Sequence, residues 1–305
     1  MISLMRPTVA YPPIALHRTR TSHDRGGDRG RGCWPVQTDP MAGVARGVSL
    51  SGRRALVTGG SRGLGRQVAL ALSDAGASVT VVGRDPDALR QTCSSAPDGA
   101  ISVIEADLAN PAGPQSVVDR ALAVDDTWHI VVNCAGVAVT QPIGTISPAD
   151  WRHAFAVNVD APFVICQGMA GALVASGSGR IVNVSSHSGR RPQHGSAAYS
   201  ASKAALQMLT LSLAVELGPY EVTANAICPT VFMSEMGRRL WNDPDVVAAK
   251  TDLIPAKRFG EIEEIADLIL FLVSDHAAFI NGAVIGVDGG LFAGRPAPGR
   301  PVWPY

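Results

Sequence analysis

The sequence predicts a single α/β domain in which helices cover both faces of a doubly wound, seven-stranded parallel sheet. From Arg53 onward, short apolar runs rich in Val and Ile alternate with segments of helical periodicity, which is the order of βαβ units. A glycine-rich turn joins the first apolar run to the first helical segment, as expected where a parallel strand enters its crossover helix. The chain has 305 residues, 46% of them hydrophobic and 17% charged, which is enough for one large buried core.

Seven short apolar runs predict the strands, and periodic segments between them predict the helices. The predicted strands are 55–57, 79–82, 101–104, 130–132, 181–184, 224–227 and 284–287. The predicted helices are 63–75, 86–95, 111–124, 148–175, 198–218 and 261–274.

Both ends of the chain differ from this pattern. Residues 1–47 are rich in Arg, Gly and Pro and have no apolar period, so we expect a disordered extension there. A start at Met41 and a targeting segment are alternatives, although an apolar signal core is missing and the acidic residues are atypical of a transit peptide. The prolines of 294–305 exclude a helix or a central strand, which leaves 48–293 as the predicted domain.

Charge and cysteine content exclude several classes of function. Lys and Arg together number 26, as do Asp and Glu, so no net charge attracts nucleic acid or an acidic membrane. The 5 cysteines form no CxxC pair and no histidine lies at metal-ligand spacing, so we expect neither a zinc site nor a disulfide framework. No apolar run approaches the roughly 20 residues needed to span a bilayer. We therefore expect a cytoplasmic protein whose partners are a small molecule and other copies of itself.

The glycine-rich turn predicts a dinucleotide site. Gly59 allows a sharp turn after the first strand, and Gly63 and Gly65 let the backbone and the following helix approach a pyrophosphate at the positive helix N-terminus. A glycine triplet alone is a weak signal, but its place between a strand and a helix strengthens it. The turn therefore indicates a Rossmann fold.

The spacing TGxxxGxG in this turn resembles the short-chain dehydrogenase/reductase family, and the likeness extends through 53–292. Residues 133–136 resemble the NNAG motif of the family, with Cys134 in place of the second Asn. The segment from Pro229 resembles the one that flanks the nicotinamide, with Thr230 in place of Gly. The resemblance implies a nucleotide site formed by Gly59, Ser61, Arg62, Gly63, Leu64, Gly65, Arg84, Asp107, Leu108, Asn133, Ala135, Gly136, Tyr199, Lys203, Pro229, Val231 and Ser234.

Charge at the end of the second strand favours NADP(H) over NAD(H). An acidic side chain there usually binds the ribose hydroxyls of NAD, whereas a 2′-phosphate calls for Arg. Gly83 stands where NAD-preferring members of the family tend to carry Asp, and Arg84 follows it. Arg62 in the glycine turn is a second cation. We expect NADP(H), with NAD(H) as the alternative because Asp85 is close by.

A tyrosine and a lysine one helical turn apart predict the reacting end of the site. Tyr199 and Lys203 lie on one face of the helix predicted at 198–218. A neighbouring ammonium, together with an oxidised nicotinamide, is expected to lower the pKa of the phenol from about 10 towards neutrality. Such a phenol can give a proton to a developing alkoxide or take one from an alcohol.

The spacing YxxxK is weak by itself, and its upstream neighbours strengthen it. Ser186 ends the strand predicted at 181–184 and matches the catalytic serine of the family, whereas Ser185 is expected to point to the opposite face. Asn158 resembles the fourth catalytic residue. The resemblance implies Tyr199 as the general acid/base, Ser186 as a donor to the carbonyl oxygen, Lys203 as a ligand of the nicotinamide ribose, and Asn158 as the holder of a relay water. No metal is needed for this chemistry.

The substrate is the least determined part of the prediction. The segment from Pro229 to about 252 is expected to be a lid, and its sequence most resembles the polyol and L-xylulose reductase branch of the family. This favours a small polar or sugar-like carbonyl compound. Candidate substrate contacts are His187, His194 and Trp241; Arg190 and Arg191 can meet a substrate carboxylate or phosphate or can be solvated loop residues.

Two other functions remain open at this point. The first is a reductase of 3-oxoacyl thioesters on an acyl carrier protein, which the same catalytic residues would serve. The second is a catalytically silent nucleotide-binding module, against which an intact set of catalytic residues argues. The segment 279–290 resembles the closing strand of the family, which usually contributes to an oligomer, so we expect a homotetramer or a homodimer.

Overall fold

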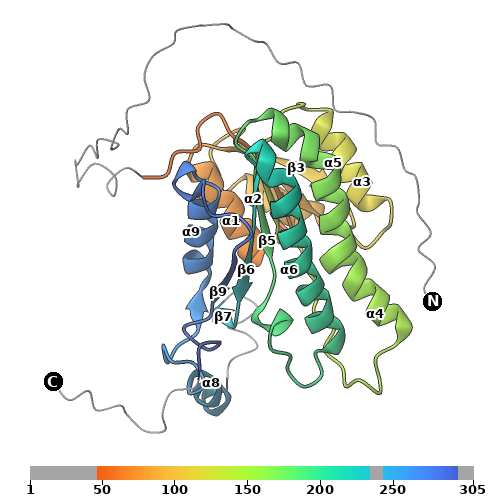
Figure 1. Ribbon diagram of the computed structural model, residues 1–305, viewed down its shortest axis with the longest axis vertical. Helices are drawn as coiled ribbons and strands as arrows, with labels where there is room; N and C mark the ends of the chain where they lie inside the picture. Colours follow the sequence, from red (N-terminus) through yellow and green to blue (C-terminus); the bar gives the residue numbers. More distant parts are fainter. Residues whose placement is uncertain (1–46, 234–242, 295–305) are drawn as a thin grey trace, which may run out of the picture. The chain divides into compact units, whose positions relative to one another are not determined.

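A computed structural model describes residues 47–233 and 243–294 and confirms the predicted fold class (Figure 1). The main sheet has seven strands in the order β3-β2-β1-β4-β5-β6-β9, and every pairing in it is parallel. Its strands are β1 (Arg54–Thr58), β2 (Ser78–Gly83), β3 (Ile101–Glu105), β4 (Ile130–Asn133), β5 (Arg180–Val184), β6 (Thr223–Pro229) and β9 (Val284–Val287). Each contains one of the seven predicted apolar runs.

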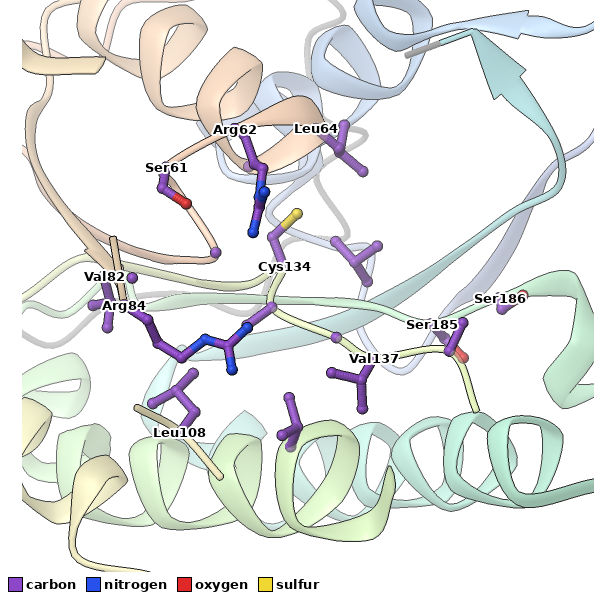
Figure 2. Close-up of a pocket in the computed structure, with 18 of the residues that line it drawn as sticks. Ser61, Arg62, Leu64, Val82, Arg84, Leu108, Cys134, Val137, Ser185 and Ser186 are labelled. Atoms are coloured by element: carbon purple, nitrogen blue, oxygen red, sulfur yellow. The ribbon is translucent and has the colours of Figure 1, made fainter. Parts of the chain in front are cut away.

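The strand order indicates which edge of the sheet binds ligands. The chain runs outward from β1 through β2 to β3, then returns to β4 on the other side of β1. Ligands of open α/β sheets bind outside the carboxyl ends of the strands where the order reverses in this way. A cleft opens at this edge, where the turns after β1, β4 and β5 meet (Figure 2).

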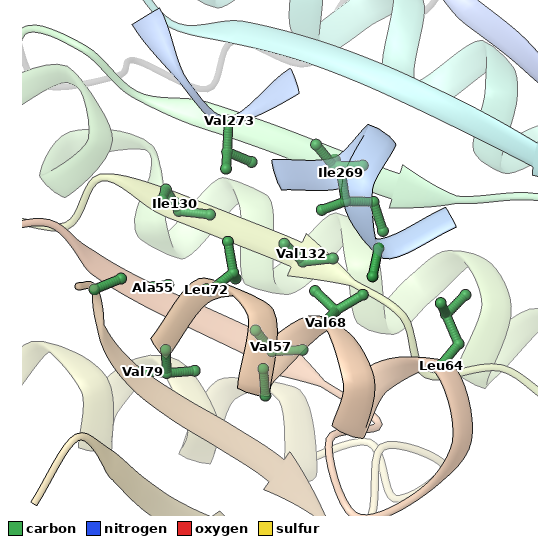
Figure 3. Packing of buried hydrophobic residues seen from close by; sticks show 14 of the residues in the cluster. Ala55, Val57, Leu64, Val68, Leu72, Val79, Ile130, Val132, Ile269 and Val273 are labelled. Carbon is green, nitrogen blue, oxygen red and sulfur yellow. The ribbon is translucent and has the colours of Figure 1, made fainter. Parts of the chain in front are cut away.

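The two faces of the sheet bury separate apolar clusters. On one face, Val57 and Val132 pack against α1 (Gly63–Asp74) and α9 (Ile262–Leu272), and Val68 and Ile269 come from these two helices (Figure 3). On the other face lie α3 (Gly113–Leu122), α5 (Ala161–Ala175) and α6 (Ala197–Leu217). Because helices cover both faces of the sheet, most residues of the strands are apolar, whereas the edge strand β3 exposes Ser102 and Val103.

Side-chain caps and prolines set the beginnings of several helices. The Asp85 carboxylate accepts from the backbone N–H of Asp87 and Ala88, and Pro86 then opens α2 (Pro86–Cys93). Ser147 caps α4 (Pro148–Phe155) in the same way. At α9, Glu261 and Glu264 form a reciprocal capping box.

The helix predicted at 148–175 is interrupted, which corrects the sequence prediction. Between α4 and α5 lies a π-helical turn, Ala156–Asp160, where the backbone N–H of Ala161 bonds the carbonyl of Ala156. Pro162 has no N–H to give to the carbonyl of Asn158, so the regular α-helical ladder cannot continue through this point. The wider turn places Asn158 inward, fully buried.

The same stretch also corrects the expectation about apolar runs. Pro148–Ala175 is long and apolar enough, by length and composition alone, to cross a membrane. Half of its most apolar window is buried inside the fold, and α5 packs against α3 and α6. The core of this domain therefore accounts for its apolar character.

A further helix and a second, two-stranded sheet were not predicted. The strands β7 (Phe232–Met233) and β8 (Gly260–Glu261) pair in parallel. Helix α8 (Pro244–Thr251) begins after Asp243, whose carboxylate caps it, within the segment expected to be a lid. The predicted extension 1–47 and tail 294–305 lie outside the described residues except at their inner ends.

Candidate active site

The glycine turn after β1 is packed too closely for other residues. Gly59 has a φ of 72°, and a Cβ there would lie 2.9 Å from Ala135. A Cβ on Gly65 would lie 2.2 Å from the carbonyl oxygen of Gly59. Two of the predicted glycines therefore let the turn fold onto α1 and onto the end of β4. At Gly63 a Cβ would meet no neighbouring atom. Glycine is favoured there because its φ of 56° is a backbone conformation that other residues rarely adopt.

The first turn of α1 is arranged for an anion. Arg62 at its N-cap makes no side-chain capping bond, and the first turn carries no acidic residue. The N–H groups at this helix end therefore keep their capacity to bind a phosphate, assisted by the helix dipole. Figure 2 shows Arg62 and Arg84 both reaching into the cleft beside this turn.

The cleft has a volume of about 400 Å³ and joins the predicted nucleotide and reacting ends in one cavity. The predicted residues that line it are Gly59, Ser61, Arg62, Leu64, Gly65, Arg84, Asp107, Leu108, Ala135, Gly136, Ser186, Tyr199, Lys203 and Pro229. A glycine turn, two arginines and an uncapped helix end fit the phosphates of a dinucleotide.

The end of β2 has no acid available for a ribose. A Cβ on Gly83 would already contact Ser61 at 3.3 Å, so a larger side chain has little room there. The Asp85 carboxylate is engaged as the cap of α2. Arg84 lies 3.9 Å from Asp107, and both side chains are at least half exposed, so this ion pair holds Arg84 only weakly.

Tyr199, Ser186 and Lys203 converge at the other end of the cleft. Tyr199 lies in the first turn of α6, and its hydroxyl is hydrogen-bonded to the side chain of Ser186. The Lys203 Nζ lies 5.9 Å from the centre of the Tyr199 ring and donates to the carbonyl of Val184 at 2.8 Å. Lys203 is buried.

Burial is the main cause of the pKa shifts of Tyr199 and Lys203 in the protein without a bound nucleotide. It raises the pKa of Tyr199, and the hydrogen bond from Ser186 opposes the increase. It also lowers the pKa of Lys203 to about 8. The sequence predicted a lowered phenol pKa. In the protein alone the pKa of Tyr199 is raised instead, so these side chains do not lower it by themselves.

The burial of Lys203 predicts a pH-dependent contribution to stability. Its folded pKa of about 8 lies below its usual 10.5, so between these values the unfolded chain binds more protons. Stability from this group is therefore reduced below pH 8 and recovers as the pH rises towards 10.5. In thermal unfolding followed by circular dichroism, we expect the wild type to gain about 2 kcal/mol relative to Lys203→Met between pH 8 and pH 10.

Comparing the two proteins removes the contributions of the buried groups that Lys203 does not influence. Burial raises the pKa of the Cys134 and Cys166 thiols to about 12, so both favour the folded state less as the pH rises above 9. Both proteins contain these thiols, so the Cys166 contribution cancels. The Lys203 charge lowers the pKa of Cys134, so the difference between the proteins includes this smaller effect. Parallel pH profiles for the wild type and Lys203→Met would contradict the prediction.

The side chain of Asn158 is fully engaged with protein groups. Its Oδ1 accepts from the N–H of Val137 at 2.9 Å, and its Nδ2 donates to the Val137 carbonyl and to Ser202 Oγ, each at 2.9 Å. The amide therefore ties the end of β4 to α6, on the wall of the cleft. A relay water at this residue would have to use its backbone rather than its side chain.

Some predicted residues lie elsewhere. Asn133 does not line the cleft: its Nδ2 donates to Asn183 Oδ1 at 2.8 Å and so joins β4 to β5 inside the sheet. Val231 and His187 line a second cavity, whereas His194 is exposed and lines neither. Ser234 and Trp241 lie outside the described residues.

Two more residues complete the reacting end: Ser185, for which the expected position on the opposite face was wrong, and Gln207, which the sequence did not single out. Ser185 lines the cleft too, and its hydroxyl donates to the Lys203 carbonyl at 2.9 Å. Gln207, one turn beyond Lys203 on α6, donates to Ser185 Oγ and to the Ser186 carbonyl. These bonds hold β5 against α6. The helical spacing of Gln207 from Lys203 is the only signal that could have found it.

The comparison with known proteins agrees with this geometry. Residues 59–292 match the family model described as Enoyl-(Acyl carrier protein) reductase. The L-xylulose reductase of Bos taurus is 39% identical over 250 residues, which cover 81% of this chain and 99% of that protein. The D-erythrulose reductase of Gallus gallus is 38% identical over 245 residues, which cover 80% of this chain and 97% of that protein. The sequence resemblance to L-xylulose reductases is thus confirmed.

Solved structures show the same fold. A gluconate 5-dehydrogenase from Burkholderia cenocepacia, in complex with NADP and tartrate, has a TM-score of 0.74 and 31% sequence identity. The alignment covers 80% of this chain and 97% of that structure. The glycine turn, the shared cleft and these relatives lead to one conclusion: the chain belongs to the short-chain dehydrogenase/reductase family.

Proposed function

We propose that this protein is an NADP(H)-dependent oxidoreductase that interconverts a small, sugar-like ketone and its secondary alcohol. The observation that carries the proposal is the single cleft in which Arg62 and Arg84 lie at one end and Tyr199, Ser186 and Lys203 lie at the other. The relatives named for reduction of L-xylulose and D-erythrulose, over almost their whole length, support a polyhydroxy carbonyl substrate.

Each residue of the reacting end has a role that its position supports. When bound, NADP(H) supplies or accepts the hydride. Tyr199 gives a proton to the carbonyl oxygen during reduction and takes it back during oxidation. Ser186 donates a hydrogen bond to the same oxygen, and Lys203 binds the ribose and places a positive charge beside the phenol. Asn158 fixes the end of β4 beside them.

The cofactor is NADP(H) in preference to NAD(H). Arg62 and Arg84 reach into the cleft, while Asp85, which follows β2, caps a helix. A dianionic 2′-phosphate gains two cations there, whereas an unphosphorylated ribose meets, just after β2, only a carboxylate that already caps a helix. NADP in related solved structures supports the same preference.

We also propose a homo-oligomer, either a tetramer or a dimer, in the cytoplasm. Large apolar side chains are exposed on α6, at Met208 and Val215, and before β9, at Phe279. Exposed apolar surface of this kind is typical of subunit interfaces. The cysteines among the described residues are all unpaired, which suits a reducing compartment.

A reductase of 3-oxoacyl thioesters is the second candidate. The description of the matching family model and a solved relative described as a putative betaketoacyl-ACP reductase support it. A catalytically silent module is disfavoured, because Tyr199, Ser186 and Lys203 meet in the cleft that would hold the nucleotide.

Substrate panels test the proposal. We expect the purified protein to oxidise NADPH in the presence of L-xylulose with a kcat/KM at least about tenfold higher than with acetoacetyl thioesters, because a polyol-type relationship extends over most of the chain. Diacetyl serves as a small carbonyl reference, and NADH is compared with NADPH for each substrate. Turnover of the thioesters alone would favour the second candidate, and tight NADPH binding without any turnover would favour the silent module.

A further inference from the structure

A second cavity of about 380 Å³ lies beside the reacting end. Thr230 lines both this cavity and the nucleotide cleft, and His187, which lines the second cavity, directly follows Ser186. A substrate whose carbonyl reaches Tyr199 and Ser186 therefore has this cavity available for the rest of its carbon chain. The volume falls within the range typical of small-molecule sites.

Among the residues that the structure describes, the charged side chains that line this cavity are Arg191 and Lys250, and no carboxylate lines it. Neither cation forms an ion pair with any of the residues that the structure describes. Two exposed cations of the same region are paired: Lys257 with Asp252 at 3.2 Å, and Arg258 with Glu264 at 2.6 Å. Arg190, next to Arg191, donates to the Val284 carbonyl at 2.7 Å. Two cations that line one cavity and have no counter-ion among the described residues favour an anionic ligand.

His187 gives an independent indication that a polar ligand binds here. It is only 5% exposed, and neither ring nitrogen has a hydrogen-bond partner in the described part of the chain. A buried polar group without a partner is costly and uncommon in folded proteins. Its ring meets Phe292 edge-on at 5.6 Å, which orients the ring without satisfying its nitrogens.

The His187 ring is neutral at pH 7, because its pKa lies below the usual value. Burial is the main cause that lowers its pKa, and Arg191 acts in the same direction, whereas Asp288 opposes them. The Asp288 carboxylate is itself engaged by the backbone N–H groups of Gly290 and Phe292. A neutral imidazole offers one donor and one acceptor, which suits a substrate hydroxyl. The positive charge of the cavity therefore comes from Arg191 and Lys250.

Apolar side chains form most of the remaining wall. They are Pro192, Val231, Leu253, Ile254, Phe259 and Leu291. Apolar walls with a few polar groups are typical of small-molecule sites, in which the polar groups fix the orientation of the ligand.

We propose that the substrate carries a carboxylate: it is a sugar-type oxo acid, or the corresponding hydroxy acid, whose carboxylate binds Arg191 and Lys250 while its carbonyl reacts at Tyr199. This inference rests on the proposed function, because it needs the carbonyl at Tyr199 and NADP(H) in the adjoining cleft. His187 binds a hydroxyl of the same substrate and acts as a specificity residue.

A matched pair of ketoses tests the proposal. L-Sorbose and 5-keto-D-gluconate share the ketone and the stereocentres, and differ at the remote carbon, which is a hydroxymethyl group in one and a carboxylate in the other. We expect kcat/KM for NADPH-dependent reduction to be about 10- to 100-fold higher for the acid, as charge-assisted hydrogen bonds contribute that much to binding. L-Xylulose is included as a neutral reference.

Two variants locate the effect. In Arg191→Gln and in Lys250→Gln, the ratio of kcat/KM between the acid and L-sorbose should fall about tenfold, mainly through the KM of the acid. The matched control is Arg152→Gln, an exposed arginine on α4 that lines neither cavity. This variant should keep the wild-type ratio.

The outcomes separate this inference from the function on which it rests. Reduction of L-xylulose or L-sorbose without a preference for the acid would overturn the inference and leave the proposed function in place. A preference for the acid that survives in both variants would also overturn it, because the carboxylate would then bind elsewhere. Failure to reduce any of the three compounds would overturn both.

Discussion

Replacing Tyr199 by Phe is expected to lower kcat by about 10²- to 10⁴-fold while leaving the Kd for NADPH nearly unchanged. The change removes only the phenolic proton donor, which lies beside Ser186 in the cleft. The ring that packs near Lys203 remains. Steady-state oxidation of NADPH measures the first quantity, and fluorescence titration with NADPH measures the second.

The control for this prediction is Tyr220→Phe. Tyr220 is 43% exposed and lies in the short helical turn Gly218–Tyr220 after α6, so the loss of its hydroxyl should change neither quantity. A Tyr199→Phe protein that keeps more than about a tenth of the wild-type kcat would rule out the phenol as the proton donor.

Replacing Gly65 by Ala is expected to weaken NADPH binding by about a hundredfold or more. The new Cβ would lie 2.2 Å from the carbonyl oxygen of Gly59, which is backbone and cannot rotate away. The glycine turn and the first turn of α1 must then move apart. A shift of about 1 Å in groups that position a ligand can cost about a hundredfold. Fluorescence titration with NADPH provides the measurement, with circular dichroism to confirm that the variant is folded.

The matched control is Gly144→Ala. A Cβ at this exposed position meets nothing within 4 Å, and Gly144 has no positive φ, so the substitution should leave NADPH binding unchanged. An equal affinity for NADPH in Gly65→Ala and Gly144→Ala would show that the close packing of the glycine turn does not shape the nucleotide site.

Much of the architecture could be predicted from the sequence because the signals are local. Each of the seven parallel strands contains one predicted apolar run, since strands covered on both faces consist mostly of apolar residues. The main error was the segment 148–175, whose apolar periodicity continues through the π-helical turn Ala156–Asp160. The spacing of apolar residues does not reveal one wider turn. Pro162 was the local signal that the regular α-helix is interrupted here.

The residues of the candidate site could be predicted where motif spacing alone identifies them. Most of the predicted nucleotide residues line one cleft, together with Ser186, Tyr199 and Lys203. Asn133 did not follow this pattern, because its neighbour across the sheet, Asn183, takes up its amide. A motif identifies which residues lie near each other in the chain, but not which of them point into the cleft.

By itself, therefore, the sequence determined the fold class, the glycine turn and the pairing of Tyr199 with Lys203, all of which depend on residues close together in the chain. Only the tertiary structure decided that Asn158 holds Val137 and Ser202, and that His187, Arg191 and Lys250 line one cavity. These contacts join segments far apart in the sequence. Their geometry follows from how helices and loops pack on the sheet, which no local pattern encodes.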